Sequence, residues 1–446
     1  MREETIEKEI DLNKRYNFPS PIRIISYKNM YLVISVLTAK WIVLKNKEQL
    51  YFFDLLNNAL IGQAIEAFNG SDDDWNNVLV QIEAKKIIET NIKKSSEGKR
   101  KLHFYLTNFC NIRCPHCYMF AGKKSKRELS FDEIISTLRN YKKNGGEQVT
   151  FSGGELTTRK DFCEIIEYAS KLNLEILLLT NGILWTDEQI RRIAPLIYSV
   201  QISIDGYNED VNAKVRGAGN FSRALHTVER FLFAGAKTEI AITPYFDSML
   251  KENFLEYSFF AKKLLKKYEN YDLNIRFSSD LIDGRNVKLS AKEKLEYHNI
   301  AEKIMSNFYG VDAHIFPFIS VNKENIIHDN CSFGELAISC EGDIFFCSRI
   351  PSMQSNINVR THTFEEIMKL SNKAADLSKI TNLAPCNNCE LMYICGGDCR
   401  IEYFPEFSTL NVEELEKVSI QPRKCTKEYK NHFYEMMIKT NEDLFV

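Results

Sequence analysis

The chain has 446 residues, of which 44% are hydrophobic, and a formal net charge of −2. That length exceeds one ordinary domain and predicts two or three. The near-neutral charge excludes any general argument for a nucleic-acid or membrane partner. The charged N-terminus lacks an apolar signal region, and the longest apolar stretch, residues 31–44, is too short to span a bilayer. We therefore expect a protein of the reducing cytoplasm.

The first hundred residues predict a small mixed domain, at residues 1–95. Runs rich in β-branched and aromatic residues predict strands at 22–25, 31–34 and 41–44. Helical patterns follow at 48–56, 61–68 and 74–88. This order resembles the winged-helix-like domains with which maturases of ribosomal peptides bind the leader of a precursor as an added strand. The alternatives are a generic winged-helix cap and a nucleic-acid binder, although no basic stripe is concentrated here.

Residues 93–100 are polar and charged and predict a linker to the core. From residue 101 to 310 strands alternate with helices, which predicts a parallel α/β sheet. The predicted strands are 102–107, 148–152, 175–180, 199–204, 238–243 and 274–277. The predicted helices are 131–141, 161–172, 187–193, 222–233, 252–266 and one that begins with a capping box at 290–293.

Three cysteines follow the first core strand in a C-x3-C-x2-C pattern: Cys110, Cys114 and Cys117. Cysteine thiolates ligate [4Fe-4S] clusters, and three of them leave one iron of the cube free for a group that is not protein. With His116 before the last cysteine, the pattern resembles the signature of radical S-adenosylmethionine (SAM) enzymes. The resemblance implies a partial (β/α)6 TIM barrel with its site at the carboxyl ends of the strands. A zinc knuckle is the alternative.

Polar and glycine residues follow the next three core strands. Paired glycines let the backbone approach a ligand closely, and in the family a Gly-Gly-Glu motif meets the amino group of SAM. Arg216 has the geometry to pair with the SAM carboxylate, but a solvated surface arginine is equally compatible with the sequence. Asn-Gly and Asp-Gly are also strong turn formers in their own right. The residues that the resemblance assigns to SAM binding are Ser152, Gly153, Gly154, Glu155, Thr180, Asn181, Ser203, Asp205 and Arg216. The sequence identifies no general base.

Eight of the twelve cysteines lie between residues 331 and 425, at metal-like rather than disulfide-scaffold spacings. Their order resembles the SPASM extension of radical SAM enzymes, here residues 325–446, and implies two auxiliary [4Fe-4S] clusters, three in all. By position the outer cluster is assigned to Cys386, Cys389, Cys395 and Cys425, and the inner one to Cys331, Cys347 and Cys399. A structural zinc ribbon is the alternative for the first two of these alone.

Cys340 is either a fourth ligand of the inner cluster or a bystander. Without it, the inner cluster has an open iron to which a substrate thiolate can bind. We favour the open site slightly.

Together these resemblances imply a radical SAM peptide maturase, an oxidoreductase that generates a 5′-deoxyadenosyl radical from SAM and abstracts a hydrogen from a precursor peptide. The protein then mainly positions the reacting atoms. A cysteine thioether crosslink is the first expectation, a carbon–carbon (cyclophane) crosslink the second and epimerisation the third. An anaerobic sulfatase-maturating type of enzyme and a non-catalytic electron-transfer protein are the alternatives. The expected partners are a precursor peptide with a leader and an electron donor such as flavodoxin or ferredoxin.

Overall fold

The computed structural model describes residues 11–90, 93–94, 99–310, 326–327, 329–349, 355–397, 399–400 and 425–445. Its elements form three sheets: one of three strands, one of eight and one of two. In the described residues, no helix combines the length and apolar character that crossing a membrane requires.

The N-terminal part consists of a three-stranded antiparallel sheet followed by three helices, as predicted from the sequence. The elements are β1 (Ile22–Tyr27), β2 (Met30–Ser35), β3 (Lys40–Leu44), α1 (Lys47–Leu56), α2 (Ile61–Ala67) and α3 (Asp72–Lys85). Lys28 and Asn29 join β1 to β2 with φ angles of 47° and 62°, which is the geometry of a tight two-residue hairpin. Helix α1 begins at Asn46, whose side chain accepts a hydrogen bond from the Gln49 amide.

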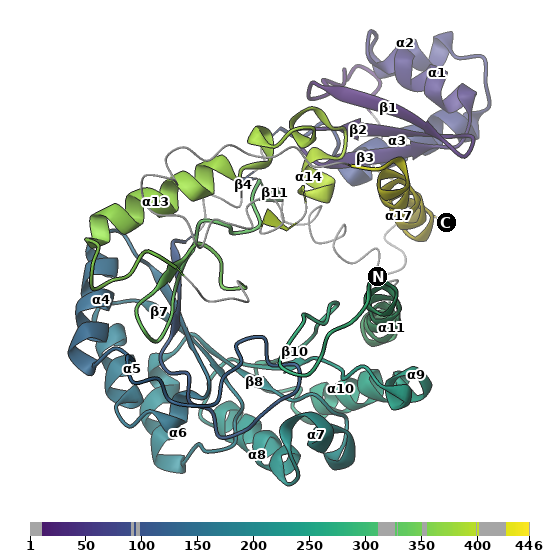
Figure 1. The fold of residues 1–446 in the computed structure, drawn as a ribbon. Coiled ribbons are helices and arrows are strands. Elements are labelled where there is room, and N and C mark those ends of the chain that lie inside the picture. Colours follow the sequence, from purple (N-terminus) through teal and green to yellow (C-terminus); the bar gives the residue numbers. More distant parts are fainter. Residues whose placement is uncertain are drawn as a thin grey trace.

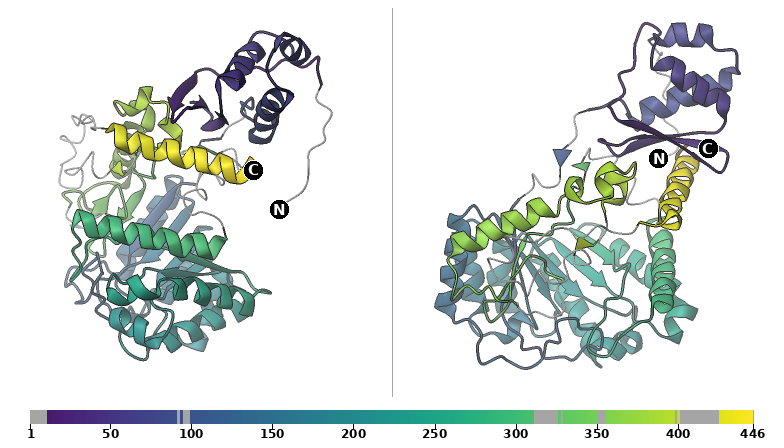
Figure 2. Two further views of the ribbon diagram at one scale, coloured as in Figure 1. Left: turned by 90° about the vertical axis from the view of Figure 1, so that its right-hand side faces the viewer. Right: turned by 45° about the horizontal axis from the view of Figure 1, so that its top comes forward.

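Both faces of this small sheet are covered. Because side chains alternate along a strand, Val33 and Ile42 pack against α1–α3, whereas Ile34 and Trp41 point to the opposite face. There they contact the last helix, α17 (Lys427–Phe445), through its apolar residues Tyr434, Met437 and Ile438. Figures 1 and 2 show α17 lying against the N-terminal sheet. The N-terminal sheet and the C-terminal helix are thus packed together.

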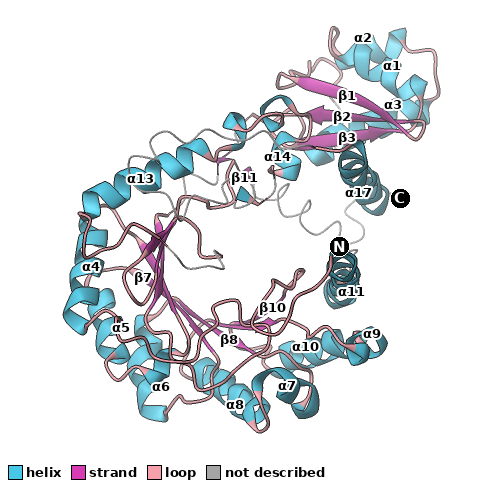
Figure 3. Ribbon diagram, in the orientation of Figure 1, coloured by secondary structure: helices cyan, strands magenta, loops and turns pink. Residues whose placement is uncertain are grey.

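Six parallel strands form most of the large sheet, and neighbours in sequence are neighbours in space. They are β5 (Lys101–Tyr105), β6 (Gln148–Ser152), β7 (Glu175–Thr180), β8 (Ser199–Ser203), β9 (Thr238–Ile242) and β10 (Leu273–Phe277). The helices are α4 (Phe131–Lys143), α5 (Phe162–Lys171), α6 (Asp187–Ile193), α7 (Glu209–Arg216), α8 (Asn220–Phe233), α9 (Ser248–Asn253), α10 (Leu255–Lys267) and α11 (Ala291–Tyr309), with short 3-10 helices at Leu156–Thr158 and Ala194–Leu196. Figure 3 shows the helices on the outside of a curved sheet.

The two faces of the curved sheet differ in polarity. Alternate side chains such as Phe104, Phe151 and Ile202 are buried in the main core with the helices. Residues of the other parity face the hollow side, where Glu239 accepts a hydrogen bond from Arg276 at 3.0 Å. The side chains of this inner face are less buried than those that face the helices, which contrasts with the filled interior of a closed barrel.

The C-terminal residues extend the same sheet, which the sequence did not predict. Strand β12 (Leu336–Ile338) pairs parallel with β5, and β13 (Ile344–Phe345) pairs antiparallel with β12. The eight strands run in the order β10-β9-β8-β7-β6-β5-β12-β13, so the sheet has two ends in the described residues and does not close. The remaining described elements are α13 (Phe364–Leu377), the 3-10 helices Ile380–Asn382 and Cys386–Asn388, and α14 (Met392–Cys395).

The predicted linker at 93–100 is wrong in part. Strand β4 (Lys93–Lys94) pairs parallel with β11 (Ile326–Ile327), and Lys99 forms an ion pair with Glu175. Main-chain pairing needs no apolar side chain, so a polar composition did not reveal it. Residues 95–98 lie outside the described residues.

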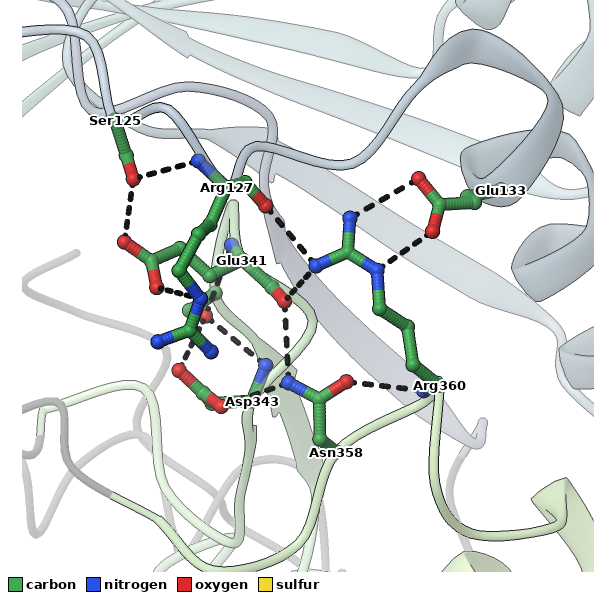
Figure 4. Close-up of polar contacts among 8 residues, drawn as sticks. Ser125, Arg127, Glu133, Glu341, Asp343, Asn358 and Arg360 are labelled. Carbon is green, nitrogen blue, oxygen red and sulfur yellow. Dashed lines mark hydrogen bonds and ion pairs between the residues drawn. The ribbon is translucent and has the colours of Figure 1, made fainter.

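A polar network fastens the β12–β13 hairpin to the segment that leads from the cysteine triplet to α4 (Figure 4). The Arg360 guanidinium donates to Glu133 at 2.6 and 3.1 Å and also to the carbonyl of Glu341 at 3.2 Å. Hydrogen bonds from Arg360 lower the pKa of Glu133 to about 2. The Ser125 hydroxyl donates to the Glu341 carboxylate at 2.6 Å. These contacts therefore fix the position of the C-terminal hairpin relative to the first part of the core.

Candidate functional site

The cysteine triplet lies on the loop that follows β5. Burial raises the pKa of the Cys114 thiol to about 11, the charges of Cys117 and Cys110 add to this effect, and the Arg216 charge opposes it. The three thiols therefore lie near enough to one another for their charges to interact. Cluster assembly must release the thiol protons, because iron binds the thiolate. In the described part of the chain, no three His, Cys, Asp or Glu side chains are arranged around a single metal ion.

The loop after β10 clamps the triplet loop, a role that the sequence did not reveal. The Arg285 amide donates to the Cys117 carbonyl at 3.2 Å, and its guanidinium donates to the carbonyls of Cys114 and Ala121. The Asn286 amide donates to the Pro115 carbonyl at 2.7 Å. The sequence gives only one indication of this role: a polar loop that contains a glycine follows the sixth parallel strand. In α/β barrels the loops at the carboxyl ends of the strands form the active site.

Gly284 sits where this clamp touches the triplet loop. A Cβ atom there would lie 2.4 Å from the carbonyl carbon of His116, so Gly284→Ala must push the two loops apart. We expect this variant to lose most of the SAM-type cluster, measured as iron per chain and as the electron paramagnetic resonance signal of the reduced protein. Gly235→Ala is the control, because its Cβ meets nothing within 4 Å and costs only backbone strain of about 1 kcal/mol. Equal cluster content in both variants would contradict the clamp.

The Gly153-Gly154 pair lies directly against the triplet loop. A Cβ at Gly153 would lie 2.4 Å from the Thr107 carbonyl oxygen, and one at Gly154 would lie 2.1 Å from that of Phe109. The amides of Gly154 and Glu155 donate to these same two carbonyls at 2.7 and 2.9 Å. The absence of a Cβ at both glycines therefore allows a close contact between two backbone segments. The contact of these glycines with SAM stays a prediction.

Glu155 is buried in the loop that follows β6, and its carboxylate binds residues at the end of the next strand, β7. Its carboxylate accepts from the Thr180 hydroxyl at 2.7 Å and from the Asn181 amide at 2.8 Å. The Asn181 side chain lies 3.9 Å from the Cys110 sulfur. Burial raises the pKa of Glu155, while these hydrogen bonds oppose the shift. Three of the residues assigned to SAM binding thus meet each other beside the triplet.

Asp205 and Arg216 form a buried ion pair at 2.6 Å, so the alternative of a solvated surface arginine is wrong. The other Asp205 oxygen accepts from the Thr243 amide, and His116 Nε2 lies 3.5 Å from Asp205. Burial disfavours the Arg216 charge, but Asp205 and Cys114 outweigh it and raise the pKa. Ser203 ends the adjacent strand β8 and Ser152 ends β6. Eight of the nine residues assigned to SAM binding therefore lie on strand ends or in the loops that follow them, and the ninth, Arg216, is the last residue of α7 and reaches this group through Asp205.

Two tyrosines, the buried Tyr105 and the half-buried Tyr118, have neighbours near both the triplet and Cys347. The Tyr105 hydroxyl donates to the Ser348 carbonyl at 2.6 Å and hydrogen-bonds with Tyr118. Burial raises the pKa of Tyr118, and the charges of Cys117 and Cys347 add to this effect. Burial, with smaller contributions from the charges of Cys331 and Cys399, raises the pKa of the Cys347 thiol to about 11, so the charges of these three cysteines interact.

Cys340 is buried elsewhere, in the turn between β12 and β13. Burial raises the pKa of its thiol to about 12, with further contributions from Glu128 and Glu341. Its carbonyl accepts from the Leu129 amide at 2.7 Å. These neighbours belong to the triplet side of the sheet, and none is one of the three cysteines assigned to the inner cluster.

The four cysteines assigned to the outer cluster line one cavity of about 250 Å³. Tyr429 and Lys430, from the first turn of α17, also line it, and the Tyr429 hydroxyl lies 3.6 Å from the Cys395 sulfur. Lys430 in turn forms an ion pair with Glu390 at 2.9 Å. A four-cysteine cavity fits a [4Fe-4S] cube with every iron ligated. The cysteines of this cavity are Cys386, Cys389, Cys395 and Cys425.

Comparisons with known proteins agree with this site. The Radical SAM superfamily matches residues 104–253. Mycofactocin maturase MftC of Mycolicibacterium smegmatis is 36% identical over 146 residues, 32% of this chain and 37% of that protein. Fe-coproporphyrin III synthase of Methanosarcina barkeri is 27% identical over 357 residues, 72% of this chain and 88% of that protein.

A solved structure titled native anSMEcpe with bound AdoMet and Cp18Cys peptide has a TM-score of 0.54 and 16% sequence identity, covering 78% of this chain and 99% of that one. This likeness shows the fold. The chain spans a little over a third of the length of the mycofactocin maturase that it matches. The matched residues contain the cysteine triplet, the Gly-Gly-Glu motif and the buried Asp205–Arg216 pair. Residues 104–253 therefore form a domain of the Radical SAM superfamily.

Proposed function

We propose that this protein is a radical SAM enzyme that modifies a ribosomally made precursor peptide. The single observation that carries the proposal is the arrangement of Cys110, Cys114 and Cys117 beside the Glu155 and Asp205 loops, next to an open, polar sheet face. Bound together, the cluster and SAM supply a radical that abstracts a hydrogen atom from the substrate. The maturase relatives support a peptide as that substrate.

The chain's own residues have three tasks in this reaction. The clamp of Gly284 and Arg285 fixes the triplet loop, and the Glu155 carboxylate remains to accept a hydrogen bond from the SAM amino group. Asp205 orients Arg216, whose remaining guanidinium N–H groups are the donors for the SAM carboxylate. Burial of these groups excludes water, which suppresses competing reactions.

We assign the inner auxiliary cluster to Cys331, Cys347 and Cys399, with Cys340 as a bystander. The support is that the charges of Cys331 and Cys399 act on the pKa of the Cys347 thiol. The charges that act on the pKa of the Cys340 thiol are instead those of Glu128 and Glu341. A three-cysteine cluster keeps one iron open for a substrate thiolate. That arrangement favours a thioether crosslink over carbon–carbon bond formation or epimerisation.

A second candidate function is the modification of a porphyrin, because the match to Fe-coproporphyrin III synthase extends over 72% of this chain. One experiment separates the two. Anaerobically reconstituted protein is incubated with SAM and one of two sets of substrates. These are candidate precursor peptides, chosen as short cysteine-rich reading frames near its gene, or Fe-coproporphyrin III and its precursors. The products are measured by mass spectrometry. We expect a loss of two hydrogen atoms from the peptide and an unchanged porphyrin. A modified porphyrin with an unmodified peptide would refute the peptide proposal.

We assign the outer cluster to the cavity of Cys386, Cys389, Cys395 and Cys425, where it also anchors α17. Cys425 lies two residues before the first residue of this helix, and the helix packs against β3. We expect Cys389→Ala/Cys395→Ala/Cys425→Ala, which leaves one of the four ligands, to lower iron from about twelve to about eight atoms per chain. Hydrogen exchange of the β3 amides should rise in the same variant. The buried Cys163, in α5, provides the control: Cys163→Ala should keep its iron and its β3 protection.

A further inference from the structure

Around the cysteine triplet lies an exposed surface that the proposed chemistry does not use. We name it the triplet-rim surface: Phe109, Phe120, Lys123, Lys124, Lys126, Phe131 and Lys160. The three rings are 40%, 53% and 36% exposed. Residues 120–131 carry four cations and one carboxylate within a chain of net charge −2. Apolar side chains surrounded by cations form a surface for an acidic protein partner.

The rim is built directly on the cluster-binding loop. The Gly122 amide donates to the Asn108 carbonyl at 2.7 Å, and the Phe120 amide donates to the Cys117 carbonyl at 3.2 Å. Residues 109 and 122 also form a β-bridge. The rim therefore borders both ends of the segment that carries Cys110, Cys114 and Cys117. A partner seated here lies next to the cluster.

Phe120 is the strongest sign that the rim is functional. Its φ is +50°, a region that bulky residues rarely adopt, and its ring is nevertheless exposed. Its neighbour Met119 instead packs inward against the small core cluster of Tyr105, Ala337 and Phe345. A strained backbone that displays an apolar ring is more typical of a binding site than of a stabilising feature.

The cations of the rim are available to a partner. Lys123, Lys124, Lys126 and Lys160 are exposed, and none forms an ion pair with a carboxylate of the described residues. An open cavity of about 560 Å³ lies between Lys124, Lys126 and Lys160, with Phe109 and Phe131 in its lining. Weak electron-transfer encounters use small interfaces of this kind, steered by charge.

We propose that the triplet-rim surface docks the protein that reduces the SAM-type cluster, a small acidic one-electron carrier. In this step one electron leaves the reduced cofactor of the carrier and enters the cluster at Cys110, Cys114 and Cys117. The carrier is oxidised, the cluster is reduced, and no bond or proton changes. The proposal rests on the radical SAM chemistry proposed above but not on the identity of its substrate.

The test compares two reductants on one preparation. SAM cleavage, measured as 5′-deoxyadenosine formed per minute without any peptide, is driven either by purified flavodoxin kept reduced by its NADPH-dependent reductase or by dithionite. The variant is Lys123→Glu/Lys124→Glu/Lys126→Glu. The matched control is Lys262→Glu/Lys263→Glu/Lys266→Glu on α10, which makes the same change in net charge on the outer side of the barrel.

At low ionic strength we expect the rim variant to need at least about tenfold more flavodoxin for half-maximal rate, with a weaker salt dependence than the wild type. The rate with dithionite should be unchanged, and the α10 control should behave as the wild type. Phe120→Gly removes the ring and relieves the strained φ, so it should weaken flavodoxin coupling without lowering stability. Equal loss with both reductants, or equal loss in the two triple variants, would overturn the proposal. Failure of peptide modification would not affect this assay.

Discussion

Replacing Cys110, Cys114 and Cys117 together with alanine is expected to abolish the formation of 5′-deoxyadenosine from SAM. Iron should fall from about twelve to about eight atoms per chain, because one of three four-iron cubes is lost. The physical reason is that the cluster we assign to these three thiolates would lie beside the Glu155 and Asp205 loops, where SAM is expected to bind. Seven of the other nine cysteines are assigned to separate sites, namely the cavity of Cys386, Cys389, Cys395 and Cys425 and the group of Cys331, Cys347 and Cys399, and Cys163 and Cys340 belong to neither.

The measurement is 5′-deoxyadenosine by chromatography, combined with iron analysis and electron paramagnetic resonance of the reduced protein. Persistent reductive cleavage of SAM in the triple variant would refute the assignment of the triplet. Iron near four atoms per chain in the wild type would instead refute the two auxiliary clusters and leave the triplet untouched. The assignment of the triplet cluster and that of the two auxiliary clusters can therefore be refuted independently.

The sequence predicted the elements whose signals are local. The six core strands have continuous β-type runs, and all six are present within one to two residues of the predicted bounds. The capping box at Ser290 is also present, with Glu293 bonded back to the Ser290 amide. Short-range patterns of this kind are set by neighbouring residues and need no knowledge of the tertiary structure.

What the sequence did not reveal depends on contacts between distant segments. Strand β12 has three residues, too few for any periodic signal, yet it extends the core sheet by pairing with β5. Gly284 is unremarkable in sequence, and its role follows only from its position against His116, 168 residues earlier in the chain. Arg216 was equally compatible with the surface and the site until its pairing with buried Asp205 was visible.

The N-terminal sheet offers two edges for a leader peptide, and the structure distinguishes them. At the β3 edge, the Val43 amide and carbonyl both bond to the side-chain amide of Gln81 from α3, at 2.9 Å each. Gln81 thus makes the two hydrogen bonds that a peptide unit of an added strand would make. All five residues of β3 are buried beside α3, whereas β1 is largely exposed. Because specificity in strand addition comes from side-chain pockets, we propose that the leader adds at β3 and displaces Gln81.

Two variants of this edge should act in opposite directions. Gln81→Ala removes the competitor and should tighten leader binding by up to about fivefold, the value of one net hydrogen bond. Val43→Pro removes the outward amide and should weaken leader binding by about tenfold or more, and an edge strand tolerates such a proline. Ile24→Pro is the control at the β1 edge. Tyr27 and Met30 form the hydrogen-bonded pair that closes the Lys28–Asn29 turn, so by alternation the Ile24 amide points away from β2.

Point variants are preferable to deleting the domain, because deletion would uncover the apolar side of α17 at Tyr434, Met437 and Ile438 and would disturb the outer cysteine cavity. Leader binding is measured by fluorescence anisotropy, and peptide modification and leader-independent SAM cleavage are measured on the same preparation. We expect Val43→Pro to reduce modification while SAM cleavage stays at the wild-type rate, because tethering only raises the local concentration of the core peptide. If Ile24→Pro weakens binding while Val43→Pro and Gln81→Ala do not, the leader adds at β1. If none of the three changes binding while modification proceeds, the sheet is not the recognition surface.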